Sequence, residues 1–86
     1  MSVGEVKVGL RAATEAALHG RDTLDRASAG AKAASAAAEA ILNDSQNEDV
    51  KTVQQALLAA DAEVEPTRRR FVTIAERATR YLNQLG

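Results

Sequence analysis

Arginine offers the clearest binding chemistry in this 86-residue chain. Residues 68–70 are three consecutive arginines, and Arg77 and Arg80 follow at helical spacing. Guanidinium groups bind phosphate, so contact with a nucleic acid or another phosphate is one interpretation. The other is a solvated helix face whose arginines pair with Asp22 and Asp25. Because the net charge is −1 and nothing else resembles a nucleic-acid-binding fold, we predict the solvated face and no nucleic-acid partner.

Catalytic and metal-binding residue types are sparse. His19 is the only histidine and has no second ligand one helical turn away, so it predicts neither a metal site nor a general base. The chain has no cysteine, which excludes a disulfide, a thiolate zinc site and a cysteine nucleophile. Phe71 and Tyr81 are the only aromatic residues, too few to line a ligand cavity. We therefore predict no enzymatic activity, no cofactor and no small-molecule substrate.

A long helix is predicted for residues 3–42. Ser2 followed by Glu5 is a capping-box pattern, in which both side chains satisfy free amides at a helix start. Alanine dominates residues 26–42 and lets a second helix approach closely. Small or apolar residues recur at alternating spacings of three and four, which is the heptad pattern of a packed helix. They are Val3, Val6, Leu10, Ala13, Ala17, Gly20, Leu24, Ala27, Ala31, Ala34, Ala38 and Ile41.

Residues 43–47 predict a turn, and a second helix follows over about residues 48–85. The turn sequence NDSQN is rich in residues that end helices, and Ser45 with Glu48, or Asn47, offers a cap for the next one. Pro66 interrupts this helix, and we predict a kink there, with a full break as the alternative. The heptad residues are Val50, Val53, Leu57, Ala60, Val64, Thr67, Phe71, Ile74, Ala78, Tyr81 and Leu85.

A five-residue turn between two long helices makes them antiparallel neighbours. We therefore predict an all-α fold, a coiled-coil-like antiparallel two-helix hairpin that forms a single domain over residues 1–86. Pairing the two heptad patterns outward from the turn places Gly20 opposite Phe71. A glycine opposite the only phenylalanine is the complementary packing expected of a correct register.

Alanine also occupies the flank of the first helix, beside its heptad positions. One interpretation is a solvated face on which alanine only raises helix propensity. The other is a face covered by a further helix, and we predict a homodimeric four-helix bundle, or pairing with a related helical hairpin protein. The predicted interface residues are Ala12, Ala16, Ala33, Ala37, Ala40, Leu58, Val72, Ala75 and Leu82.

The first residues and the apolar runs of the sequence bear on localisation. Its first 18 residues lack a basic leader followed by an unbroken apolar core, so we predict no cleaved secretory signal. Charged residues interrupt every apolar run, so we predict no membrane span. The expectation is a cytoplasmic protein, or one that is exported without a cleaved signal peptide.

A hairpin of two long helices in a chain of this length is similar to the WXG100 (ESAT-6-like) proteins of type VII secretion. Tyr81 stands where their carboxy-terminal export pattern has a tyrosine, with Leu85 in place of its acidic residue. The resemblance implies a four-helix-bundle dimer and a secretion substrate or secretion partner. The termini MSVGEVK and RYLNQLG also resemble those of small uncharacterised actinobacterial hairpin proteins. Our principal prediction is a self-associating, non-enzymatic interaction module, and the secretion role is the alternative.

Overall fold

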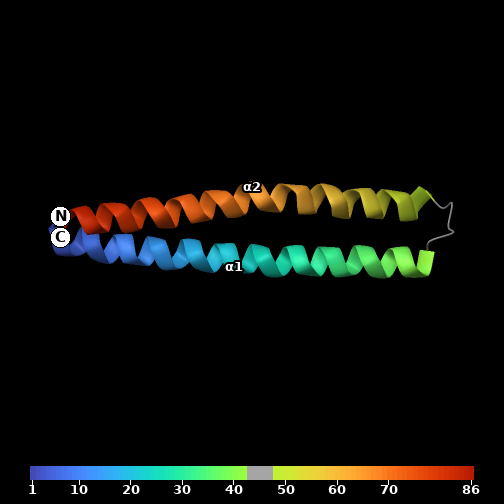
Figure 1. Cartoon of the computed structure of the whole chain (residues 1–86), viewed down its shortest axis with the longest axis horizontal. Helices are drawn as coiled ribbons and strands as arrows, with labels where there is room; N and C mark the ends of the chain where they lie inside the picture. The colour runs from blue at the N-terminus through green and yellow to red at the C-terminus, as the bar shows by residue number, and fades with distance from the viewer. Residues whose placement is uncertain (43–47) are drawn as a thin grey trace.

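A computed structural model describes residues 1–42 and 48–86, and these form two helices that lie side by side (Figure 1). Helix α1 spans Val3–Leu42 and helix α2 spans Glu48–Gln84. The helices are antiparallel, and both ends of the chain lie at the same end of the rod (Figure 1). The molecule measures 62 × 17 × 15 Å. The predicted all-helical hairpin is confirmed.

Helix α1 begins where the capping pattern predicts. The Ser2 hydroxyl oxygen accepts a hydrogen bond of 3.1 Å from the Glu5 amide, and the Ser2 carbonyl accepts one of 3.1 Å from the Val6 amide. Ser2 is therefore the N-cap, as predicted. The predicted turn at residues 43–47 and the alternative caps of the second helix at Ser45 and Asn47 lie outside the described residues.

Helix α2 continues through Pro66 without a break. The proline is exposed, so its ring lies away from α1. A proline lacks the amide hydrogen that would bond four residues back, and water can satisfy the carbonyl left free on such a surface. A full break of the second helix, the alternative prediction, is therefore wrong.

Half of the predicted packing pattern is confirmed. In both helices, residues at one of the two heptad positions lie between the helices and are buried or half-buried. In α1 these are Leu10, Ala17, Leu24, Ala31 and Ala38, whereas the first predicted residue, Val3, is exposed. On the other side they are Val50, Leu57, Val64, Phe71 and Ala78 of α2 and Leu85 just beyond its end. The predicted partner of Val50, Ile41, has a side chain outside the described set.

The other predicted heptad position is mostly wrong, because among the described residues only its members Val6, Gly20 and Thr67 are half-buried. Its residues Ala13, Ala27 and Ala34 in α1 and Val53, Ala60, Ile74 and Tyr81 in α2 are exposed. The residue that follows each of them takes the place between the helices. These residues are Thr14, Ser28 and Ser35 in α1 and Gln54, Asp61, Ala75 and Leu82 in α2. Viewed along its own chain direction, each helix is thus turned about its axis in the same sense relative to the prediction.

Polar contacts across the pair account for this rotation. The Ser28 hydroxyl donates a hydrogen bond of 2.6 Å to the Asp61 carboxylate, and Arg68 Nε donates one of 2.7 Å to the Asp25 carboxylate. Of the two possible rotations, the observed one leaves Val53, Ile74 and Tyr81 exposed, so burial of large apolar side chains does not select it. Satisfied polar pairs favour it instead, because a half-buried carboxylate without a partner loses free energy.

The interior of the hairpin is small. Of the described residues, only Ala17, Ala75 and Ala78 are buried, and no large side chain is fully buried. A compact protein of 9.1 kDa exposes about 4,900 Å². This hairpin exposes 6262 Å², roughly 1,400 Å² more. The fold therefore leaves much apolar surface in contact with water.

Candidate interaction surfaces

The rotation of the helices gives the hairpin two long edges of different character. We call the first the uncharged edge. It contains the residue that directly precedes each of the seven packing residues Thr14, Ser28, Ser35, Gln54, Asp61, Ala75 and Leu82, together with Val6, Gly20 and Thr67 at the same heptad position. In an antiparallel pair, residues at this position fall on the same side of both helices. Its members are Val6, Ala13, Gly20, Ala27 and Ala34 in α1 and Val53, Ala60, Thr67, Ile74 and Tyr81 in α2.

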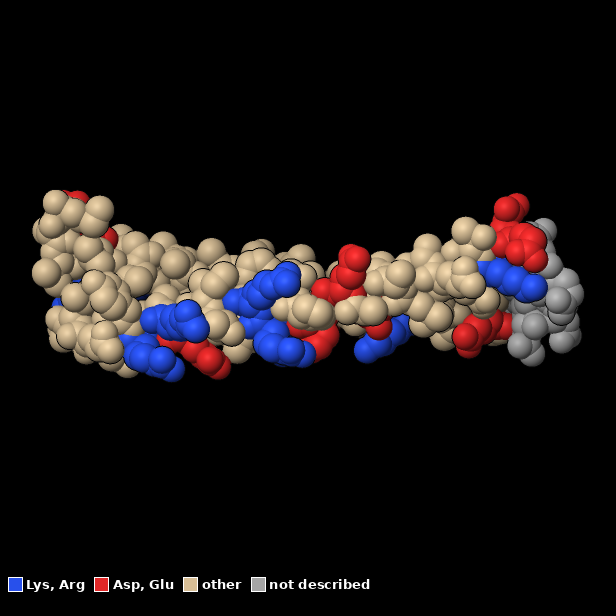
Figure 2. Space-filling view, turned by 90° about the horizontal axis from the view of Figure 1, so that it is seen from above, with Lys and Arg blue, Asp and Glu red and all other residues tan. Residues whose placement is uncertain are grey.

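The second, charged edge lies on the opposite side. Its members are Arg11, Leu18, Asp25, Lys32 and Glu39 in α1 and Lys51, Leu58, Glu65, Val72 and Thr79 in α2. The contact between Arg68 and Asp25 lies on this side of the pair. Figure 2 shows Lys, Arg, Asp and Glu side chains gathered mainly along one long edge, whereas the other edge is mostly uncharged between its two ends apart from an acidic group that projects near its middle.

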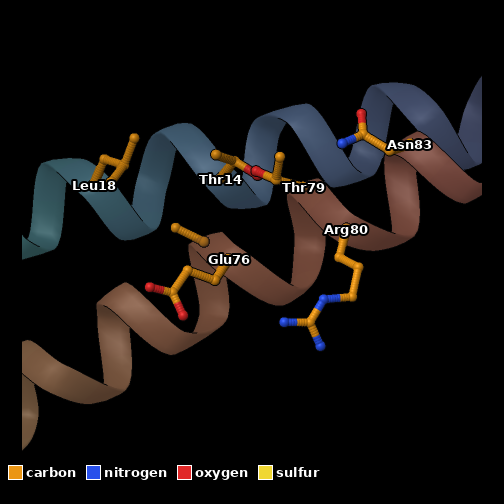
Figure 3. A pocket seen from close by; sticks show the side chains of 7 residues that line it. Thr14, Leu18, Glu76, Thr79, Arg80 and Asn83 are labelled. Atoms are coloured by element: carbon orange, nitrogen blue, oxygen red, sulfur yellow. The ribbon is translucent and has the colours of Figure 1, made fainter.

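An open groove runs along the charged edge near the ends of the chain. It is lined by Thr14, Leu18, Ala75, Glu76, Thr79, Arg80 and Asn83. Figure 3 shows the Glu76 and Arg80 side chains directed away from α1 rather than toward each other across the groove. Such a shallow surface with diverging charges lacks the enclosure and the converging polar groups of a small-molecule site.

The arginine cluster is partly engaged within the chain. Arg68 contacts Asp25 on α1, and Arg69 lies 3.6 Å from Glu65 one turn earlier on α2. The hydrogen bond that Arg68 donates to Asp25, with the charge of that carboxylate, raises the pKa of the Arg68 guanidinium. Arg68 therefore pairs with Asp25 as predicted. Asp22 instead pairs with Arg21, its neighbour on α1.

No metal site or membrane span is found among the described residues. His19 is exposed on α1, and within residues 1–42 and 48–86 no three His, Cys, Asp or Glu side chains are grouped closely enough to hold a metal ion. Neither α1 nor α2, over the same residues, has a stretch apolar enough to cross a membrane.

The predicted interface residues do not lie on one surface. Ala12, Ala16, Ala33, Ala37 and Ala40 are exposed on the outer side of α1. Leu58 is exposed on the charged edge, where it borders a groove with Lys32 and Glu39 of α1. Ala75 is 7% exposed, and Val72 and Leu82 are half-buried, because these three residues belong to the packing of the hairpin itself. The second apolar strip predicted on α2 is therefore not a free surface.

The uncharged edge holds exposed apolar residues whose spacing predicts a place between the helices. Val53 is 54% exposed, Ile74 48% and Tyr81 50%. They project from α2, whereas the same edge of α1 carries only alanine and glycine between residues 13 and 34. Gly9 and Gly30 lie next to this edge on α1, and a Cβ atom added to either would meet nothing within 4 Å. Reading the heptad one residue later would have revealed this edge.

Comparison with known proteins identifies no family. No protein-family model matches the chain, and no curated protein or solved structure shows significant similarity to it.

Proposed function

We propose that this chain is a non-enzymatic protein–protein interaction module, a helical hairpin that associates with a second copy of itself into a four-helix bundle. The observation that carries the proposal is the small interior. A chain whose only buried residues, among those described, are three alanines gains little free energy from packing as a monomer.

Self-association supplies what the single hairpin lacks. The excess exposed surface of roughly 1,400 Å² is comparable to the area that one partner buries in a stable homodimer. A two-fold dimer buries this area with no additional sequence, and it is the commonest assembly of soluble chains. A bend of α2 at Pro66 belongs to the same proposal, because long helices in bundles curve around their shared core.

Sedimentation equilibrium tests the proposal. We expect a molar mass of twice 9.1 kDa at about 100 μM chain, a concentration at which ordinary dimer affinities are saturated. Circular dichroism on the same samples checks that the dimer is helical. A chain that remains at 9.1 kDa throughout would contradict the homodimer and leave a related helical hairpin as the partner.

A second proposal is a WXG100-like role as a type VII secretion substrate or secretion partner. The antiparallel hairpin of two helices supports it. The test is expression in a host with an active type VII system, with a host lacking the secretion ATPase as the control. ATPase-dependent appearance of the chain in the medium would favour secretion, and equal amounts from both hosts would contradict it.

A further inference from the structure

We infer that the second copy packs on the uncharged edge, with the two-fold axis parallel to the helices, so that α2 of each copy covers α1 of the other. The inference rests on the self-association proposed above and assigns its surface and orientation. It keeps Ala16 of the predicted alanine flank and otherwise replaces that flank and the α2 strip with residues that the structure places on one side of the molecule.

The uncharged edge is suited to a copy of itself. None of its ten members is charged, so the centre of a contact between two copies would hold no charge. Glu63 and Arg70, two charged residues that border this edge, lie on the outer side of α2, at the rim of such a contact. The rod is 62 Å long and 17 Å wide, and such a side projects to about 1,000 Å². That area exceeds the roughly 800 Å² per partner of a typical stable interface.

The register of the two helices fixes which residues of the two copies would lie at the same height along the rod. Contacts between Gly20 and Phe71 and between Ser28 and Asp61 align the two helices. Ile74 accordingly lies at the level of Ala17. Rotation about an axis parallel to the helices does not move a copy along the rod. Each residue therefore lies at the same height along the rod in both copies. Each α2 side chain then faces the α1 residues at its own level on the other copy.

In this arrangement Ile74 and Tyr81 meet smaller residues, whereas the small Ala60 meets other small residues. Ile74 of one copy faces a hollow on the other copy that is bounded by residues three, four and seven apart, the geometry of knobs-into-holes packing. The hollow consists of Ala13, Ala16, Ala17 and Gly20, in which Ala17 is buried and forms the floor, while the Phe71 ring of the same copy lies against Gly20 at one end. Tyr81 faces the hollow of Val6, Gly9, Leu10 and Ala13, and Ala60 faces that of Ala27, Gly30, Ala31 and Ala34.

The glycines provide a second, independent reason. Gly9 and Gly30 have open space around them in the hairpin, yet glycine is a poor residue for a helix interior. Packing within the chain does not require either glycine. Both fall in hollows that would receive a side chain of the second copy, where a missing Cβ allows a closer approach of the backbones.

A two-fold axis perpendicular to the helices fits less well. It would place α1 on α1 and α2 on α2, so that Val53, Ile74 and Tyr81 would meet each other while alanine met alanine. The two helix pairs would then need different separations, which two rigid hairpins cannot both satisfy along their full length.

Matched substitutions on α1 test the surface. Ala27→Glu with Ala34→Glu introduces two charges on the uncharged edge, and Ala29→Glu with Ala36→Glu introduces the same charges two residues later on the far side of the helix. All four alanines are exposed, so neither change disturbs the hairpin interior. We expect the first pair to weaken dimerisation by about 100-fold or more and the second by less than about threefold, measured by sedimentation equilibrium.

The outcomes separate the two proposals. A monomeric parent overturns self-association itself. A dimeric parent whose affinity falls equally with both pairs, or with neither, leaves self-association in place and overturns this surface. Circular dichroism of each variant at its highest concentration confirms that it remains helical.

Disulfide trapping tests the orientation, because the chain has no cysteine of its own. Mixing an Ala16→Cys variant with an Ile74→Cys variant under mild oxidation should give a crosslinked heterodimer, whereas each variant alone should give almost none. Crosslinked homodimers of either variant, with no gain on mixing, would overturn the parallel axis.

Discussion

Gly20 of α1 lies against the ring of Phe71 of α2. A Cβ atom built on Gly20 would be 2.9 Å from Cε1 and Cζ of that ring, closer than real Cβ atoms approach. Glycine costs about 1 kcal/mol relative to alanine inside a helix, so its presence here reflects this packing. The predicted opposition of the two residues is confirmed, and with it the register of the hairpin.

Gly20→Leu should destabilise the protein. The new side chain would overlap the Phe71 ring, and overpacking of this kind costs about 1 to 3 kcal/mol, more than the gain in helix propensity. Thermal unfolding at a fixed chain concentration measures the effect. The matched control is Ala29→Leu, which adds the same bulk on the exposed side of α1 and should leave the melting temperature unchanged or raise it.

A double-mutant cycle assigns the cause. If Phe71 is responsible, Gly20→Leu should cost clearly less in a Phe71→Ala background than in the parent. Equal costs in both backgrounds would show that the glycine is required for some other reason.

The sequence predicted the helices and their register but not their rotation. Ser2 and Glu5 marked the start of α1, and the regular spacing around Phe71 carried the pattern of α2 through Pro66. Apolar spacing alone favoured the other rotation, because in α2 it places Val53, Ile74 and Tyr81 between the helices. The polar pairs that favour the observed rotation join residues far apart in the sequence.

The candidate surface was missed for the same reason. Val53, Ile74 and Tyr81 are the natural residues to bury between two helices when only their spacing is considered, so they were assigned to the hairpin interior. In the structure Ala75 and Leu82 occupy those places. The exposed residues then form an edge that continues into the alanines of α1, a juxtaposition that depends on the rotation and is absent from either helix alone.

The contact between Ser28 and Asp61 should behave as a satisfied polar pair between the two helices. Ser28→Ala removes the donor and should cost about 0.5 to 1.5 kcal/mol of unfolding free energy. Adding Asp61→Leu should recover most or all of this loss, because apolar replacement of both partners is nearly neutral or stabilising. Urea denaturation of the three proteins measures both effects, and a double variant less stable than Ser28→Ala would contradict this account.

The ion pair between Arg68 and Asp25 should contribute little to the free energy of unfolding. Because Arg68 stays protonated, its part of that contribution should not change with pH in the ordinary range. A raised folded-state pKa stabilises the fold at every pH below the unfolded value, and for an arginine that contribution is lost only in strongly alkaline solution. Arg68→Gln should lower the melting temperature slightly at low salt, by the same amount at about pH 6 and pH 9. Salt near 1 M should abolish the difference, since screening then acts over about 3 Å. A difference that grows between the two pH values would contradict the assignment.

The arginine cluster should not bind nucleic acid. Labelled duplex and single-stranded DNA titrated at low salt give the most sensitive test, because phosphate contacts strengthen as salt falls. We expect no micromolar binding. Micromolar binding that disappears when Arg68, Arg69 and Arg70 are all changed to alanine would show the prediction to be wrong.

The melting temperature as a function of chain concentration tests most directly the claim that this hairpin is completed by a second copy. If folding and dimerisation are coupled, circular dichroism should show the melting temperature rising by about 8 °C for a hundredfold increase in concentration, given an unfolding enthalpy typical of two such chains. A helical chain whose melting temperature does not change with concentration would contradict the claim.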